Sequence, residues 1–382
     1  MEQVKCNDMK PNNPFLITGY YSPEYFCNRK QETETMINAL HNGRNITLIA
    51  PRRMGKTGLI KNVFYQLHRQ QPDIVTLYLD IYPTQNLGDF IRLFASTVLG
   101  KLDSAPQKAL SRVSQFLKSC RPAFTFDELT GAPKVTIDMA PASEESTLKE
   151  IFDYLQSSEK RCYIAIDEFQ QIAEYPEKGV EALLRSYIQF IPNIHFIFAG
   201  SKQHIMQEMF LSAKRPFYQS TQTLSVERIN KTEYYHFAAD FFNRQERKLD
   251  EATFDYLYDG FSGHTWYIQV LLNRLYGYNG QPGIHLINHA IEEVVAESTY
   301  SYENLLTAYP ATGVKLLKAV AKARCVKEIN SGEFIAAYKL KAASSVNSAL
   351  KKLINNELIY KSADGYIVYD RFMAIWLSRL PF

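Results

Sequence analysis

The sequence lacks long hydrophobic runs and a cysteine framework, and each absence excludes a class of protein. No apolar run of about eighteen residues occurs, which excludes a membrane-spanning helix. The first thirty residues contain proline, asparagine and charged residues where a signal peptide needs an unbroken apolar stretch, so we expect a cytoplasmic protein. The 5 cysteines are odd in number and form no CxxC pair, so neither a disulfide framework nor a zinc ribbon is expected.

The chain also lacks repeats, linkers and compositional bias. With 382 residues, 46% hydrophobic residues and 22% charged residues, it has enough apolar surface to build a folded core, which excludes disorder. The length favours two or three domains. Since no Gly/Ser-rich or Pro-rich linker separates them, we expect these domains to abut directly.

The net charge is small, but its distribution is uneven. The whole chain carries +3. Residues 311–382 hold twelve Lys or Arg against five Asp or Glu, a net charge of +7, whereas residues 1–310 carry −4. The excess of positive charge in residues 311–382 indicates either a nucleic-acid-binding surface or lysines that lie on solvated helix faces.

Strand-like runs alternate with helical patterns over the first 228 residues, which predicts an α/β domain. Such βαβ alternation indicates a parallel sheet covered by helices, with ligands bound at the carboxyl ends of the strands. A β-hairpin around a Thr-Gly-Ala-Pro turn is predicted as an insertion near residues 123–140. The strand-like runs are NITLIA (45–50), IVTLYLDI (74–81), CYIAID (162–167), HFIFAG (195–200) and TQTLSV (221–226).

Two further domains are expected. Apolar residues three and four apart predict a helical bundle over residues 229–309. The remainder, residues 310–382, reads as three helices at 313–323, 332–339 and 344–355, followed by two strands about a Ser-Ala-Asp-Gly turn. That order predicts a winged helix domain.

The first strand-like run leads into the pattern GxxxxGK[ST], with Ala50 at its first position. In this pattern, backbone N–H groups at a helix N-terminus hold phosphates, the lysine reaches the β and γ oxygens, and the hydroxyl holds Mg²⁺. Lys56 and Thr57 take the last two roles, and the alternative is a chance match in a basic loop. The candidate nucleotide-binding residues are Ala50, Pro51, Arg52, Arg53, Met54, Gly55, Lys56, Thr57 and Gly58.

Two later strands end in polar residues that suit the same site. Asp167 is the last residue of the run at 162–167, and Glu168 follows it. Asp167 is the candidate Mg²⁺ ligand, and Glu168 is the candidate base for the attacking water. The alternative is an ordinary polar turn or a helix N-cap. Ser201, after the next run, is a candidate contact for the γ-phosphate or lytic water, and a helix N-cap is its alternative.

Several segments together resemble the archaeal-type P-loop ATPases, a branch allied to the AAA+ and STAND ATPases and to the origin-recognition initiators. The segments are Phe26–Glu32, IAIDEFQ (164–170), AKRPFYQST (213–221) and Gly263–Tyr267. The resemblance covers the chain from about Asn13 to Phe382 and implies an ATPase core with a five-stranded sheet, a helical lid and a winged helix.

The resemblance also implies roles for three further residues. Arg29 is the adenine-side candidate, with a surface position as its alternative. His264 is a candidate nucleotide contact, although the Gly-x-Pro usual in the family is Gly263-His264-Thr265 here. Arg215 is placed near the arginine finger that acts across subunits in AAA+ proteins, with a solvated basic loop as its alternative.

The predicted recognition helix is amphipathic. Its core face carries Val346, Ala349, Leu350 and Leu353, at helical spacing. The opposite face and the wing provide phosphate-contacting and base-contacting candidates, although the helix has no arginine, the commonest base reader. The alternative is a protein-binding or nucleotide-sensing winged helix. The candidate nucleic-acid residues are Ser345, Asn347, Ser348, Lys351, Lys352 and Lys361.

The leading hypothesis is a Mg²⁺-dependent ATPase that acts as a nucleotide-controlled switch. One alternative is a DNA-binding ATPase that uses the winged helix on duplex DNA. Another is a nucleotide-bound protein-interaction module with little turnover. We expect ATP and Mg²⁺ as cofactors, adenine rather than guanine because no guanine-reading motif is present, and nucleotide-dependent self-assembly.

Overall fold

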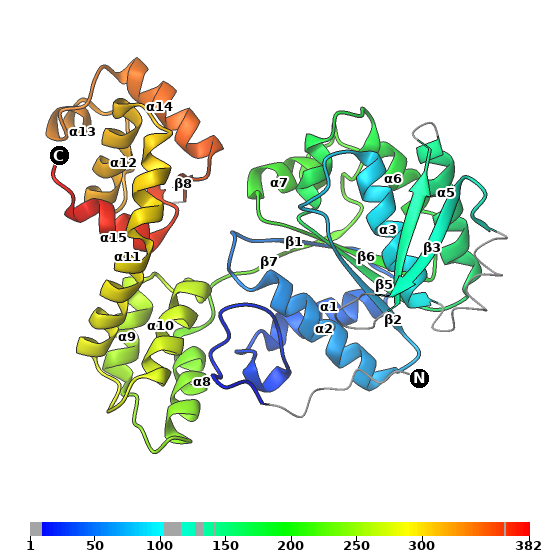
Figure 1. The fold of residues 1–382 in the computed structure, drawn as a ribbon, viewed down its shortest axis with the longest axis horizontal. Helices are drawn as coiled ribbons and strands as arrows, with labels where there is room; N and C mark the ends of the chain where they lie inside the picture. Colours follow the sequence, from blue (N-terminus) through cyan, green and yellow to red (C-terminus); the bar gives the residue numbers. More distant parts are fainter. Residues whose placement is uncertain (1–9, 103–115, 127–132, 141–142, 363) are drawn as a thin grey trace. The chain divides into compact units, whose positions relative to one another are not determined.

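The protein is described by a computed structural model that covers residues 10–102, 116–126, 133–140, 143–362 and 364–382. The described chain forms two compact units (Figure 1). The first contains the residues up to Phe237 together with His264–Trp266, and the second contains Ala238–Gly263 and Tyr267–Phe382. The domain boundaries at residues 228 and 309 stay predictions.

A sheet of five parallel strands forms the centre of the first unit, in the order β2-β5-β6-β1-β7. Its strands coincide with the five predicted runs, and the α/β fold class is confirmed. Asp80 pairs with Asp167, and Ile49 pairs with both Gly200 and Ser225, so the carboxyl ends of the strands share one edge. The strands are β1 (Ile46–Ile49), β2 (Val75–Asp80), β5 (Cys162–Asp167), β6 (Ile194–Gly200) and β7 (Gln222–Ser225).

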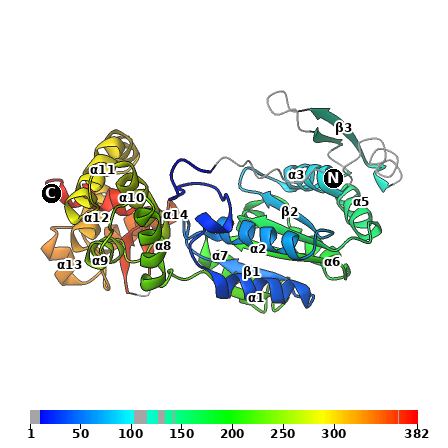
Figure 2. The same ribbon diagram turned by 90° about the horizontal axis from the view of Figure 1, so that it is seen from below.

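Helices cover both faces of this sheet, as Figure 2 shows. Alternation along β5 explains the two cores: Tyr163 and Ala165 pack with α1 and α2, whereas Cys162, Ile164 and Ile166 face the other layer. One face carries α1 (Lys30–His41) and α2 (Lys56–Gln70). The other carries α3 (Leu87–Leu102), α5 (Glu144–Ser157), α6 (Val180–Ile188) and α7 (Gln203–Leu211). Short 3₁₀ helices lie at η1 (Pro23–Tyr25) and η3 (Phe169–Glu174).

The predicted hairpin insertion is confirmed. Strands β3 (Cys120–Phe126) and β4 (Pro133–Met139) pair antiparallel, and β4 contacts α3. The hairpin begins three residues before the predicted start at 123. Most of its predicted Thr-Gly-Ala-Pro turn lies outside the described residues.

The second unit is helical apart from one small hairpin. Helix α12 packs against α14 and α15, and α11 packs against α15. The three predicted winged-helix helices and the two strands are present, but α15, which follows the hairpin, was missed. The elements from α8 onward are α8 (Lys231–Asn243), α9 (Glu251–Gly260), α10 (Thr265–Gly277), α11 (Ile284–Thr307), α12 (Ala311–Ala323), α13 (Gly332–Ala337), α14 (Ala343–Asn355), β8 (Ile359–Lys361), β9 (Tyr366–Val368) and α15 (Arg371–Arg379).

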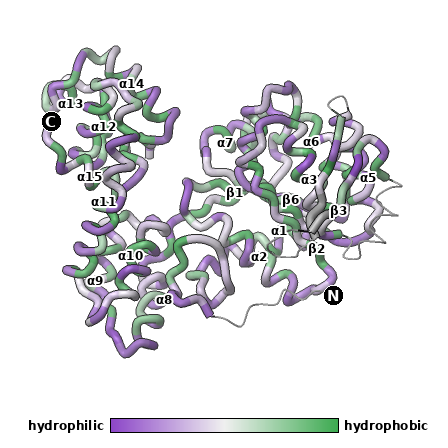
Figure 3. The backbone as a smooth tube through the Cα atoms, viewed as in Figure 1, coloured by the Kyte–Doolittle hydropathy of each residue, from purple (hydrophilic) through white to green (hydrophobic). Residues whose placement is uncertain are grey.

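Hydrophobic residues concentrate on the inner strands of the sheet, as the green segments of Figure 3 show. All four residues of β1 and all six of β5 are buried. Of the described cysteines, Cys27, Cys120 and Cys162 are free and buried, and Cys325 is free and exposed. Within the described ranges, no helix combines the length and the apolar character needed to cross a bilayer.

Candidate nucleotide-binding site

The predicted phosphate loop joins β1 to the N-terminus of α2 (Figure 1). Arg53 and Gly55 have φ values of 64° and 92°, so two left-handed residues turn the chain into the helix. Ala50 has no positive φ, is fully buried and donates its N–H to the Gly200 carbonyl at 3.4 Å. The first position of the pattern therefore accepts alanine without backbone strain.

Lys56 begins α2 and is only 6% exposed. Burial lowers the pKa of its ammonium group, and the nearby Arg52 lowers that pKa further, whereas Asp167 and Glu168 act to raise it. The N-terminus of a helix also attracts anions through its free N–H groups and its dipole. A partly dehydrated cation at this position is suited to a phosphate anion.

Thr57 and Asp167 meet across the loop, as predicted for a cation site. The Thr57 hydroxyl donates to Asp167 Oδ2 at 2.8 Å, and Asp167 is 4% exposed. A hydroxyl and a carboxylate are the hard oxygen donors that Mg²⁺ prefers, so these residues fit the ion. Within the described part of the chain, no group of three or more His, Cys, Asp or Glu that could hold a metal is found.

Glu168 is fixed beside Asp167 by two side-chain donors. Its backbone is left-handed, with φ 56°. Glu168 Oε2 accepts hydrogen bonds from the Ser201 hydroxyl at 2.7 Å and from Gln170 Nε2 at 2.5 Å. Gln170 is 1% exposed, and its Oε1 accepts from the Ser201 N–H at 3.3 Å. The candidate base and the candidate sensor are therefore held together.

Ser201 lies between the two phosphate-site strands, as predicted, because β6 separates β5 from β1. It is 8% exposed and also accepts a hydrogen bond from Arg52 Nε at 3.4 Å. The N-cap alternative for Ser201 is wrong, since Lys202 is the N-cap of α7.

Arg29 is 3% exposed, so the alternative of a surface residue is wrong. Its Nη1 pairs with Glu32 at 2.9 Å, and its Nη2 donates to the Met54 carbonyl at 3.2 Å, which ties the entry segment to the phosphate loop. Phe26 lies so close to Gly58 that a Cβ there would meet its ring at 2.9 Å. Contact of Arg29 with adenine stays a prediction.

Arg215 is engaged by carboxylates of α6 and α7. It pairs with Glu181 and, at 3.5 Å, with Glu208, and its side chain is 28% exposed. It is therefore partly buried and ion-paired, not freely solvated as the alternative held. Its action across subunits stays a prediction, as does nucleotide contact by His264, which belongs to the first unit.

Three residues near the site were missed from the sequence: Tyr78, Gln170 and Trp266. The Tyr78 hydroxyl donates to Asp167 Oδ2 at 2.7 Å. The Arg53 guanidinium lies 4.0 Å from the centre of the Trp266 ring, within the first unit. The sequence did contain a pattern that could have identified Tyr78. This residue lies two positions before Asp80, the last residue of β2, so the two side chains share one face of the sheet.

The winged-helix candidates form a polar surface on the second unit. Val346, Leu350 and Leu353 of α14 are buried as predicted, and Ala349 is half-buried. The candidate nucleic-acid residues are exposed except Ser345, which is half-buried. Their exposure fits contact with a partner, although Asn347 Oδ1 already accepts a hydrogen bond from Asn330 at 2.6 Å.

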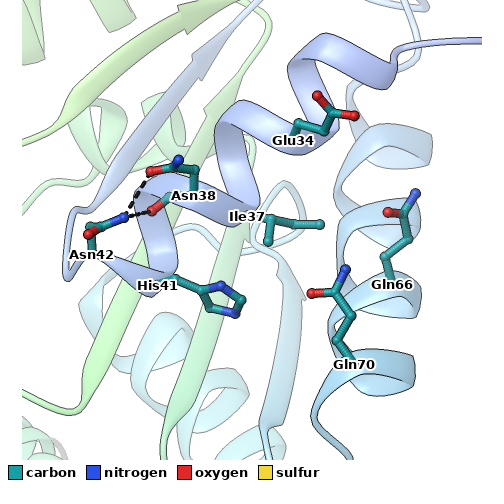
Figure 4. A pocket seen from close by; sticks show the side chains of 7 residues that line it. All are labelled: Glu34, Ile37, Asn38, His41, Asn42, Gln66 and Gln70. Carbon is teal, nitrogen blue, oxygen red and sulfur yellow. Dashed lines mark hydrogen bonds between the residues drawn. The ribbon is translucent and has the colours of Figure 1, made fainter.

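A separate pocket of about 400 Å³ lies between α1 and α2 (Figure 4). Asn42 Nδ2 donates to the Asn38 carbonyl and to Asn38 Oδ1, each at 2.8 Å. None of the predicted site residues lines it. The lining residues are Glu34, Ile37, Asn38, His41, Asn42, Gln66 and Gln70.

Comparisons with known families agree with this geometry. Residues 39–207 match an AAA domain, and residues 300–379 match a probable winged helix domain. Residues 39–207 therefore have an AAA-type P-loop ATPase fold, and a winged helix domain follows at residues 300–379. A search of curated proteins found no match to this chain.

Solved structures share the fold over nearly the whole chain. A Walker-type ATPase of Pyrococcus abyssi is 18% identical with a TM-score of 0.65, covering 95% of this chain and 99% of that one. The ORC2 protein of Aeropyrum pernix, solved with ADPNP and ADP, is 17% identical with a TM-score of 0.61 and covers 95% of each chain. The ORC1 protein of the same organism, solved with DNA, is 12% identical with a TM-score of 0.52 and covers 96% of each chain.

Proposed function

We propose that the protein binds and hydrolyses ATP with Mg²⁺ and acts as a nucleotide-controlled switch. The observation that supports this most directly is the convergence of Lys56, Thr57, Asp167 and Glu168 at the carboxyl edge of the sheet. Lys56 and the N-terminus of α2 would bind the phosphates, and Thr57 and Asp167 would hold Mg²⁺, which neutralises phosphate charge when bound.

Glu168 would act as the base. Its carboxylate would accept a proton from the attacking water, and Ser201 and Gln170 fix the orientation of that carboxylate. Arg52, hydrogen-bonded to Ser201, adds positive charge on the same side of the site. Arg215 from a second copy is the candidate for stabilising transition-state charge in a nucleotide-dependent assembly.

The test is ATP hydrolysis by the purified protein with Mg²⁺. We expect Glu168→Gln to lower turnover by about 10²–10⁴-fold, because it removes the general base, while ATP binding is retained. Glu303→Gln, on the exposed surface of α11, is the matched control. Lys56→Ala should lose ATP binding itself, and superlinear growth of activity with protein concentration would support assembly.

Retained turnover in Glu168→Gln would contradict the role of this carboxylate. If the wild type binds ATP tightly without turnover, the interaction-module alternative is favoured instead.

A second candidate function is DNA binding by the winged helix. It is supported by the exposed polar face of α14, the net charge of +7 over residues 311–382 and the match to a winged helix domain. Under this second candidate function, the nucleotide bound to the first unit would control the binding of duplex DNA by the second unit.

A further inference from the structure

Asp167 is held at both carboxylate oxygens, and one of the donors is a tyrosine outside the phosphate-site motifs. Oδ2 accepts from the Tyr78 hydroxyl at 2.7 Å and from the Thr57 hydroxyl at 2.8 Å. Oδ1 accepts from the Glu168 N–H at 3.0 Å. Rotation of this carboxylate would break at least one of these bonds.

The sheet and α2 fix the Tyr78 ring in place. Tyr78 on β2 pairs with Ala165 of the neighbouring β5, and Asp80 pairs with Asp167. The ring packs against the core formed with α1 and α2, and Lys61 Nζ of α2 lies 3.9 Å from its centre. A rigid aromatic side chain held in this way places its hydroxyl with little loss of entropy on each binding event.

The Tyr78 hydroxyl is the donor in its contact with Asp167. An ionised carboxylate has no proton and can only accept hydrogen bonds, whereas the phenol O–H can donate.

We propose that Tyr78 is a positioning residue for the divalent cation of the nucleotide complex, acting through Asp167. The inference rests on the proposed function. By holding Oδ2, Tyr78 would keep the Asp167 carboxylate oriented for the cation that Asp167 and Thr57 would hold. Partners that orient metal ligands in this way affect metal affinity by about 10–100-fold.

Tyr78→Phe tests this, since it removes one hydroxyl and keeps the ring. We measure the affinity for a fluorescent ATP analogue over a range of Mg²⁺ concentrations and in EDTA. We expect the affinity in EDTA to change less than about 2-fold and the Mg²⁺ concentration for half-maximal tightening to rise about 10-fold. The matched control is Tyr175→Phe, which likewise removes one hydrogen-bonded tyrosine hydroxyl, here one bonded to Thr84.

A double-mutant cycle with Asp167→Asn separates positioning from general destabilisation. The effect of Tyr78→Phe on Mg²⁺ dependence should largely vanish in the Asp167→Asn background, because the tyrosine acts through that carboxylate. Thermal melts of each variant verify folding.

Three results would overturn the proposal. They are an unchanged Mg²⁺ dependence in Tyr78→Phe, an equal shift in Tyr175→Phe, and an undiminished effect in the Asp167→Asn background. If the wild type binds no ATP, or binds it equally with and without Mg²⁺, the proposed function itself fails and the role of Tyr78 fails with it. Mg²⁺-dependent binding by the wild type with no effect of Tyr78→Phe removes only the role of Tyr78.

Discussion

At the scale of single residues, the candidate site holds charged groups that the fold keeps out of water. Lys56 is 6% exposed and Asp167 is 4% exposed. Burial of a charge costs free energy unless partners compensate, and desolvation is the largest influence on the Lys56 pKa. If such a residue binds a ligand, as proposed for Lys56, its burial costs stability while no ligand is bound.

This leads to a prediction about stability. Lys56→Met should raise the Tm of the nucleotide-free protein by about 1–4 °C, because it removes a poorly solvated charge and keeps the aliphatic stem. The measurement is thermal unfolding without nucleotide. Addition of MgATP should stabilise the wild type and leave the variant unchanged. A lower Tm in the variant would contradict this prediction. It would mean that the attraction of Lys56 to Asp167 and Glu168 stabilises the protein by more than the burial of its charge destabilises it.

Single residues of the candidate site differ in how far the sequence could predict them. Lys56, Thr57, Asp167 and Glu168 were identified because each belongs to a short pattern next to a predicted strand. Gln170 lies two residues beyond such a pattern, and its role depends on a side-chain bond to Glu168. Nothing in the order of residues gives the direction of that side chain.

At the scale of elements, the close approach of η3 to the end of β6 organises the site. Gln170 of η3 lies against Gly200, the last residue of β6. A Cβ on Gly200 would lie 2.4 Å from Gln170 Oε1 and 2.5 Å from Met206. The absence of a side chain at Gly200 therefore lets Gln170 reach both Ser201 and Glu168.

Gly200→Ala should consequently destabilise the protein by about 1–3 kcal/mol through overpacking. It should also displace Gln170 and lower ATP turnover. The matched control is Gly100→Ala in α3, where an added Cβ meets no atom within 4 Å; helix propensity makes that change neutral or stabilising by up to about 1 kcal/mol. Denaturant unfolding and ATP hydrolysis measure both effects. Equal stability of the two variants would contradict the close approach.

The elements themselves were largely predictable. The strand-like runs and the helical spacing predicted the five strands of the sheet, the inserted hairpin, a helical region over residues 229–309 and three helices of the winged helix domain. The omission was α15 (RFMAIWLSR), which follows the hairpin directly and for which no element was predicted. The α15 boundary is set by Asp370, whose side chain accepts from the N–H groups of Phe372 and Met373.

At the scale of the whole molecule, charge is divided unevenly along the chain. The net charge of +7 lies in residues 311–382, and the exposed Lys351 and Lys352 lie on α14. If this surface binds duplex DNA, its contacts to phosphates release counterions, and affinity falls as salt rises.

Charge reversal at Lys351 and Lys352 tests this version of the function. The double change to Glu should weaken duplex binding at low salt and reduce the slope of log affinity against log salt by about 1–2. The matched control reverses two exposed lysines elsewhere, Lys178 and Lys248. Equal losses in both variants, or no binding by the wild type at low salt, would contradict a specific role for α14.

The sequence by itself determined the fold class and the winged helix and predicted the main candidate phosphate-site residues, because hydrophobic periodicity and short motifs are local properties of the chain. Only the tertiary structure decided what surrounds them. It buried Arg29 against the Met54 carbonyl, joined Ser201 and Gln170 to Glu168, and placed the Tyr78 hydroxyl on Asp167. These contacts join residues from different strands and helices, and their geometry depends on the strand order and packing of the folded sheet.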